Sequence, residues 1–296
     1  MSRIGIVTDS SGDLPVSFYS ENKDIIMVPL YVRFGWEALM DWYDISPEFP
    51  EDKRRYTING FYEEMSKCEA VPHTIPVNVC RLQSAYEELS KECDAIISLH
   101  FSHHLGYTVK AAEITASRIK KCKVIVIDTL QISNGYGAII KELVKQRDKG
   151  LGVDELVKFV KEMMDSLNNK LIMTNRSSKY LYRCGRMNLF IYMLANIIGL
   201  KNFTIKDGKI TPLFGYRGQN GLQKLLDEAV SNVKEAVAKG KRAYVVVSHA
   251  NNDKEADLVI DRLKKEKIEC EKRFLGPITG VYGGPGTYAI MPVILN

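Results

Sequence analysis

The sequence predicts an α/β protein of two domains, in which an N-terminal parallel sheet with helices on both faces precedes a C-terminal α+β domain. Strand patterns and amphipathic helix patterns alternate along residues 4–149, which is typical of a parallel sheet. After residue 150, a hairpin pattern and longer helices replace this alternation. The chain of 296 residues is long enough for two domains of ordinary size.

The N-terminal half is expected to begin with a strand at residues 4–8, followed by turn and cap residues at 9–15. The same alternation predicts three further strands and three helices: strands at 25–32, 95–99 and 124–128, and helices at 79–93, 107–120 and 135–149. Ligands of parallel sheets bind beyond the carboxyl ends of the strands. A candidate site is therefore expected where polar residues follow these strands: Asp9, Ser98, Ser102 and Asp128.

The C-terminal half is expected to contain a hairpin, because Asp207-Gly208 lies between two alternating runs and suits a type I′ turn. The remaining patterns predict helices at 153–167, 189–199, 221–239 and 253–265, strands at 170–173 and 242–248, and a final pair of strands around 276–286. We expect domains at 1–165 and 166–296. Residues 33–60 are irregular and are expected to form an insertion or lid.

Composition and charge exclude several classes of protein. The net charge is +5, but acidic residues are interspersed with the basic ones, so no nucleic-acid partner is expected. No apolar run reaches the roughly 18 residues of a membrane span, and the N-terminus does not resemble a signal peptide. The six cysteines contain no CxxC pair. We therefore expect a cytoplasmic protein with reduced cysteines and no membrane anchor.

Histidines near the third strand suggest chemistry, but weakly. His100, His103 and His104 would share one face of a helix and could bind zinc, yet they fall at a strand-to-helix junction. No second cluster supplies a matching ligand, so no metal is expected. Ser102 beside His103 lacks the Gly-x-Ser-x-Gly elbow of an esterase, and a serine before a helix is more often its N-cap.

Two other motifs bear on ligands. The glycine-rich segment at 276–286 precedes a strand-like run, whereas a nucleotide loop opens a helix, so its glycines are expected to permit close backbone approach. Three arginines surround the Cys184-Gly185 turn: Arg176, Arg183 and Arg186. Surface solvation is the default interpretation, but an exposed arginine near a ligand entrance would suit the docking of a partner that handles phosphate or carboxylate groups.

Taken in order, the motifs resemble the DegV family of bacterial fatty-acid-binding proteins, which includes the acyl-carrying subunits of fatty acid kinase. The resemblance covers essentially the whole chain. It rests on the motifs at 7–15, 74–76, 97–102, 126–129, 180–186, 207–212, 248–250 and 276–286.

The resemblance implies an apolar tunnel at the domain interface, which holds a long-chain fatty acid and presents its carboxylate to a separate kinase. By position, it assigns the carboxylate to Thr74 and Ser102, and to Tyr282, which stands where the family usually has a histidine. Its head-group neighbours would be His73, His103 and His104, and Arg217 would dock the kinase. It implies a carrier without catalysis or cofactor, the fatty acid being its ligand.

Two other functions remain open at this point. One is an enzyme that acts on a small carboxylate or phosphate at the strand ends, using His103, His104 or Asp9. The other is a binding protein for a different apolar ligand. The ligand itself discriminates among them, because an acyl chain copurifies with its protein while a polar substrate usually washes away.

Overall fold

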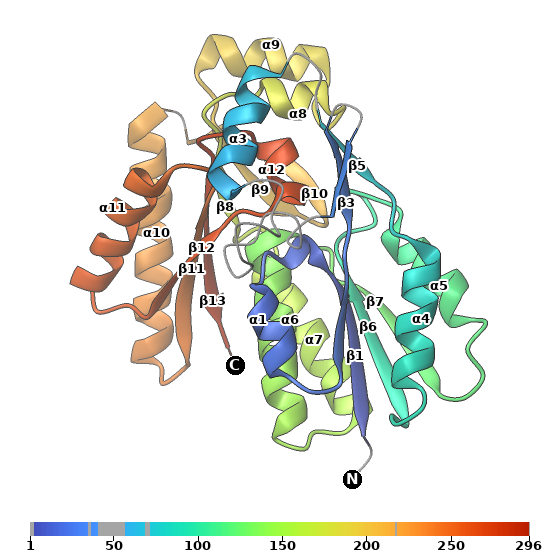
Figure 1. The fold of residues 1–296 in the computed structure, drawn as a ribbon. Helices are drawn as coiled ribbons and strands as arrows, with labels where there is room; N and C mark the ends of the chain where they lie inside the picture. Colours follow the sequence, from blue (N-terminus) through green and yellow to red (C-terminus); the bar gives the residue numbers. More distant parts are fainter. Residues whose placement is uncertain (1–2, 35–36, 41–56, 69–71, 217, 296) are drawn as a thin grey trace.

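Two sheets share a layer of helices between them (Figure 1). The computed structural model describes residues 3–34, 37–40, 57–68, 72–216 and 218–295. Helices α6 (Ser133–Asp148) and α7 (Val153–Leu167) contact strands of both sheets, so each helix buries apolar side chains on two sides. This explains why α6 is buried along most of its length.

The first sheet is parallel throughout, and its four strands lie in the order β2, β1, β6 and β7: Ile25–Val28, Ile4–Asp9, Ala95–His100 and Lys123–Asp128. Helices α4 (Val79–Leu89) and α5 (Thr108–Ala116) contact this sheet, and α6 and α7 cover its other face (Figure 1). Strands β1 and β6 are buried at every residue, as a sheet covered on both faces requires. The predicted parallel sheet with helices on both faces is confirmed.

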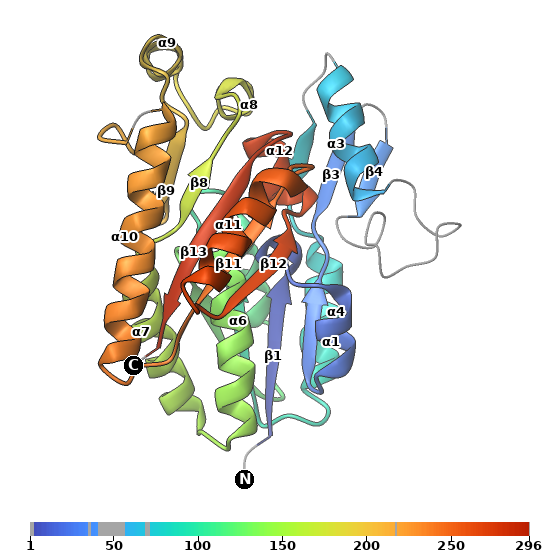
Figure 2. The same ribbon diagram turned by 90° about the vertical axis from the view of Figure 1, so that its left-hand side faces the viewer.

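The second sheet is mixed, and its six strands lie in the order β10, β9, β8, β13, β11 and β12: Lys209–Pro212, Asn202–Lys206, Ile172–Thr174, Tyr288–Ile294, Ala243–His249 and Cys270–Phe274. Only the β11–β12 pair is parallel among the described pairs of this sheet. Helices α10 (Gly218–Ala238) and α11 (Asp253–Lys265) cover its outer face (Figure 2).

Smaller elements lie above the two sheets. Strands β4 (Glu37–Met40), β3 (Tyr31–Phe34) and β5 (His73–Ile75) form a third, antiparallel sheet. The short helices here and at the start of the chain are α1, α3, α8 and α9: Val16–Glu21, Ile58–Lys67, Lys179–Arg183 and Leu189–Ile198. Of the insertion expected at 33–60, residues 35–36 and 41–56 lie outside the described residues.

The predicted hairpin turn is confirmed in its backbone. Asp207 and Gly208 have φ angles of 49° and 76°, the two positive values that a type I′ turn requires. The expected strand at 25–32 is instead divided between β2 and β3, which belong to different sheets.

The expected pair of strands around 276–286 is wrong, because this segment forms helix α12 (Pro277–Gly283). Gly276 is its N-cap and Pro277 begins it with the fixed φ that suits a first turn. The expectation that the glycines permit close approach fits the packing. A Cβ on Gly280 would lie 2.1 Å from the Tyr62 hydroxyl, and one on Gly284 would lie 2.1 Å from the Tyr180 ring.

One buried carboxyl ties the start of the chain to α12. Asp13, 1% exposed, accepts hydrogen bonds from the Ser133 hydroxyl at 2.5 Å and the Gly276 amide at 3.0 Å. Burial raises its pKa to about 7 despite these bonds and the nearby Arg273. The folded protein therefore holds a proton that the unfolded chain releases between about pH 4 and pH 7.

We expect the free energy of unfolding to fall as pH rises from about 4 to 7, by up to about 4 kcal/mol from this group. In Asp13→Asn the Asp13 contribution to this slope should disappear, because the amide is neutral at every pH and tolerates the left-handed φ of 52°. Urea unfolding at several pH values measures both proteins. An unchanged slope in the variant would contradict the assignment to Asp13.

Candidate functional site

An apolar cavity of about 190 Å³ lies where the two halves of the chain meet. Its walls come from the loops after β2 and β6, from β5, from strands β8, β9 and β10, and from α8 and α12. Most of the lining side chains are apolar: Leu30, Ile75, Phe101, Leu105, Ile132, Met173, Leu181, Ile205, Ile210 and Ile278. Such a surface favours the hydrocarbon part of a ligand.

Three of the polar side chains that line this cavity lie close together. The Thr74 and Tyr282 hydroxyl oxygens lie 2.6 Å apart, in hydrogen-bond contact. The Arg186 guanidinium lies 5.2 Å from the centre of the Tyr282 ring and donates to the Leu105 carbonyl at 2.8 Å. Thr74, Arg186 and Tyr282 also line a second cavity of about 180 Å³, together with His73 and Cys184. These three side chains thus separate an apolar space from a polar one.

The three polar side chains are held by different elements. Thr74 lies on β5 and pairs with Val32 of β3, which fixes the backbone on that side. Tyr282 lies on α12, whose Gly280 packs against the Tyr62 ring. The Tyr62 hydroxyl donates to the Leu275 carbonyl at 2.6 Å, just before α12 begins. Arg186 follows Gly185, whose φ of +68° is in the left-handed region that glycine adopts readily.

Ser102 lies elsewhere, because the hairpin turn occupies its hydroxyl. Its oxygen donates to the Gly208 carbonyl at 2.8 Å and accepts from the His104 amide at 3.2 Å. Ser102 is fully buried and does not line either cavity, although its neighbours Phe101 and Leu105 line the apolar one. Its hydrogen bond joins the loop after β6 to the β9–β10 turn, and so joins the two halves.

The two histidines after Ser102 face the solvent. His103 contacts the Asp128 carboxylate, and its ring centre lies 3.8 Å from that of His104. Partial desolvation of the His104 ring and the charge of the nearby His103 lower the pKa of His104. Neither imidazole lines either cavity, whereas His73 lines the second cavity, of about 180 Å³. Arg217 lies outside the described residues.

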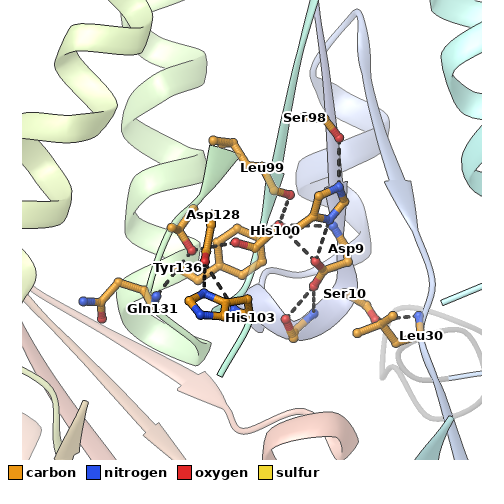
Figure 3. A network of polar contacts seen from close by, with 12 residues as sticks. Asp9, Ser10, Leu30, Ser98, Leu99, His100, His103, Asp128, Gln131 and Tyr136 are labelled. Atoms are coloured by element: carbon orange, nitrogen blue, oxygen red, sulfur yellow. Dashed lines mark hydrogen bonds and ion pairs between the residues drawn. The ribbon is translucent and has the colours of Figure 1, made fainter. Parts of the chain in front are cut away.

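The polar residues at the strand ends form a buried chain of hydrogen bonds (Figure 3). His100 lies 2.8 Å from the Ser98 hydroxyl through Nε2 and 2.9 Å from the Asp9 carboxylate through Nδ1. This Ser-His-Asp order is that of a hydrolase triad. All three side chains are fully buried, however, and none lines a described cavity, so this serine cannot meet a substrate there.

Further hydrogen bonds connect this buried network to the helices that pack on the sheet. The Tyr86 hydroxyl of α4 lies 2.8 Å from Ser98, and burial raises the pKa of Tyr86 to about 12. The Tyr136 hydroxyl of α6 donates to the Leu99 carbonyl at 2.5 Å (Figure 3). Helices on both faces are thereby attached to β1 and β6. Asp9 is a candidate residue for the enzymatic alternative, but its carboxylate is already hydrogen-bonded within this buried network.

The described residues show no other feature of the chemistries considered. They contain no group of three or more His, Cys, Asp or Glu side chains that could hold a metal ion. None of the helices in the described ranges combines the length and apolar character that a membrane span requires. All six cysteines are free.

The fold and the cavity define the class of protein. It is an α/β protein in which two sheets share a layer of helices, with an apolar cavity, lined in part by polar groups, between its two halves. The chain belongs to the DegV family: residues 3–294 match the family model described as "Uncharacterised protein, DegV family". Protein DegV of Bacillus subtilis is 26% identical over 293 residues, covering 97% of this chain and 98% of the relative.

Solved structures share the fold. A DegV family protein from Thermus thermophilus, described as fatty acid binding, has a TM-score of 0.82 and 23% identity, covering 99% of this chain and 100% of that one. The Streptococcus pneumoniae Fatty Acid Kinase (Fak) B3 protein, loaded with linoleic acid, has a TM-score of 0.78 and 17% identity, covering 99% and 100%.

Proposed function

We propose that this protein binds a long-chain fatty acid, with the hydrocarbon in the apolar cavity and the carboxylate at Thr74, Arg186 and Tyr282. The observation that carries the proposal is that two hydroxyls and one guanidinium lie together in the lining of an otherwise mostly apolar cavity. Each buried methylene contributes about 0.8 kcal/mol, so a chain of roughly 15 offers on the order of 12 kcal/mol before ordering costs. The names of structural relatives with this fold support the same ligand.

The carboxylate end needs polar partners, because a carboxylate leaving water loses its hydration. Hydroxyls donate one hydrogen bond each, and an arginine adds a charge-assisted bond of greater strength. The Thr74–Tyr282 contact shows that the two hydroxyls are near enough to share one acceptor. A bound carboxylate would replace this mutual bond.

The proposal extends to a carrier that leaves catalysis to a separate kinase in the cytoplasm. The second cavity, of about 180 Å³, supports this role. A carboxylate held by Thr74 would lie beside this polar space, which His73 and Cys184 also line. A partner that supplies a phosphoryl donor could approach from this side. The free cysteines suit a reducing compartment.

Mass spectrometry of the recombinant protein under native conditions, and again after solvent extraction, tests the ligand. We expect one fatty acid per chain, released by the solvent. A protein that carries no lipid and binds no added labelled fatty acid would refute the proposal.

Variants test the residues that hold the carboxylate. Thr74→Val and Tyr282→Phe should lower the fraction of chains that carry a fatty acid. Ser102→Ala tests the expected role of Ser102 in holding the carboxylate, and an equal loss would support that role.

A further inference from the structure

A separate depression, of about 630 Å³, lies at the ends of central strands of the six-stranded sheet. Its lining residues come from the end of β8, the start of β9, the start of β13, and helices α10 and α11. It shares no lining residue with the apolar cavity. A ligand in this depression would therefore occupy a site separate from that of the fatty acid proposed above.

An amide without a partner lies on its wall. Asn175 is 0% exposed, and neither Nδ2 nor Oδ1 has a hydrogen-bond partner among the described residues. The neighbouring amides differ: Asn202 donates to the Tyr216 carbonyl at 3.0 Å, and Asn252 donates to the Gly286 carbonyl at 2.7 Å. Burying an unpaired amide costs free energy, so the chain keeps Asn175 at a price in stability that a ligand would remove.

Cationic side chains line the same depression as this amide. They are Arg176, Lys201 and Arg262, against one acidic residue in the lining, Glu255. Arg262 contacts Asp227 through Nη2, but its buried Nη1 has no partner among the described residues. Arg176 lies across Gly286, where an added Cβ would come within 3.0 Å of its side chain. The absence of a side chain at Gly286 therefore gives this arginine its place.

The α11 residues that line the depression run from Asn252 to Arg262 along one face of the helix, so the positive charge comes from cationic side chains and not from the helix N-terminus. We propose that this depression is a binding site for a phosphate group, held by Arg176, Lys201 and the free nitrogen of Arg262. Asn175 supplies a donor and an acceptor to the same ligand.

Titration calorimetry of the full chain in a phosphate-free buffer at fixed ionic strength tests this site with inorganic phosphate. We expect saturable binding that weakens about tenfold in Arg176→Gln and in Lys201→Gln, as loss of a charge-assisted bond implies. Lys206→Gln is the matched control, because exposed Lys206 lines neither the depression nor the apolar cavity. Absence of saturable binding, or equal weakening in the control, would overturn the proposal.

Adenosine monophosphate, as a second probe, distinguishes the source of the phosphate group. Tighter binding than inorganic phosphate would assign the site to a small organic phosphate, and equal binding would assign it to the free ion; both support the site. Asn175→Ala should raise the melting temperature of the free protein by about 2–4 °C while weakening phosphate binding. A lower melting temperature with unchanged binding would show a structural role and overturn the assignment of Asn175.

Discussion

Replacing Arg186 with leucine is expected to weaken fatty-acid binding by about 10- to 100-fold, as a loss of one hydrogen bond to a charged group implies. Arg186 is the only cationic side chain in the described lining of the apolar cavity, and Tyr282 lies against it. Fluorescence displacement of a labelled fatty acid measures the affinity. A thermal melt of the same variant shows whether the fold is intact.

Two variants make this result specific. Arg183→Leu removes the same charge from the same turn, but Arg183 lines neither cavity, so it should bind as the unmodified protein does. Arg186→Lys should give an intermediate affinity, because lysine keeps the charge without the planar fork of donors. If Arg186→Leu and Arg183→Leu bind equally, the carboxylate is held elsewhere.

Gly280→Ala is expected to destabilise the protein strongly, by about 2–4 kcal/mol, as overpacking of a rigid core site does. The added Cβ would lie 2.1 Å from the Tyr62 hydroxyl and 2.8 Å from its ring. Tyr62 cannot withdraw easily, because it is fully buried and its hydroxyl bonds to Leu275. Urea unfolding measures the loss of free energy.

Gly215→Ala provides the matched control. A Cβ there would have no neighbour within 4 Å and Gly215 has no positive φ, so its stability should change little. In a Tyr62→Phe background the Gly280→Ala penalty should shrink, because the closest atom is gone. Equal effects of the two alanine substitutions would mean that α12 can move away from Tyr62.

Elements whose stability depends on nearby residues were predictable from the sequence. Residues 153–167 and 253–265 form helices over the predicted ranges. In the first, the Glu155 carboxylate accepts from the Gly152 amide, which fixes its start. Asp207-Gly208 likewise specifies its own turn through two positive φ angles. Such signals lie within a few residues of the structure that they determine.

Helix α12 was missed because its cause is not local. Glycine is a poor helix former, and four glycines fall within 276–286 beyond the N-cap. The segment becomes helical where it is buried against Tyr62, and Tyr62 lies more than 200 positions away. No periodicity within the segment records that contact, and tertiary packing overrides the low propensity.

Only part of the candidate site could be predicted from the sequence, for the same reason. The motifs named Thr74 and Tyr282, which the structure brings together, whereas Arg186 was expected at the surface or in the docking of a partner, and not at the carboxylate. Its place over Tyr282 depends on α12, the element that the sequence did not predict. The position of Ser102 depends on where the hairpin turn packs, which residues near Ser102 do not specify.

The position of β13 in the second sheet has a consequence for how the chain acquires its fold. Strand β13 follows β8 to β12 along the chain, yet it lies between β8 and β11 and pairs with both. During synthesis on the ribosome, β8–β10 and β11–β12 can form only as separate pieces with open edges. Pairings between distant segments are slow. We therefore expect the C-terminal half to assemble after translation of β13, late compared with the parallel sheet.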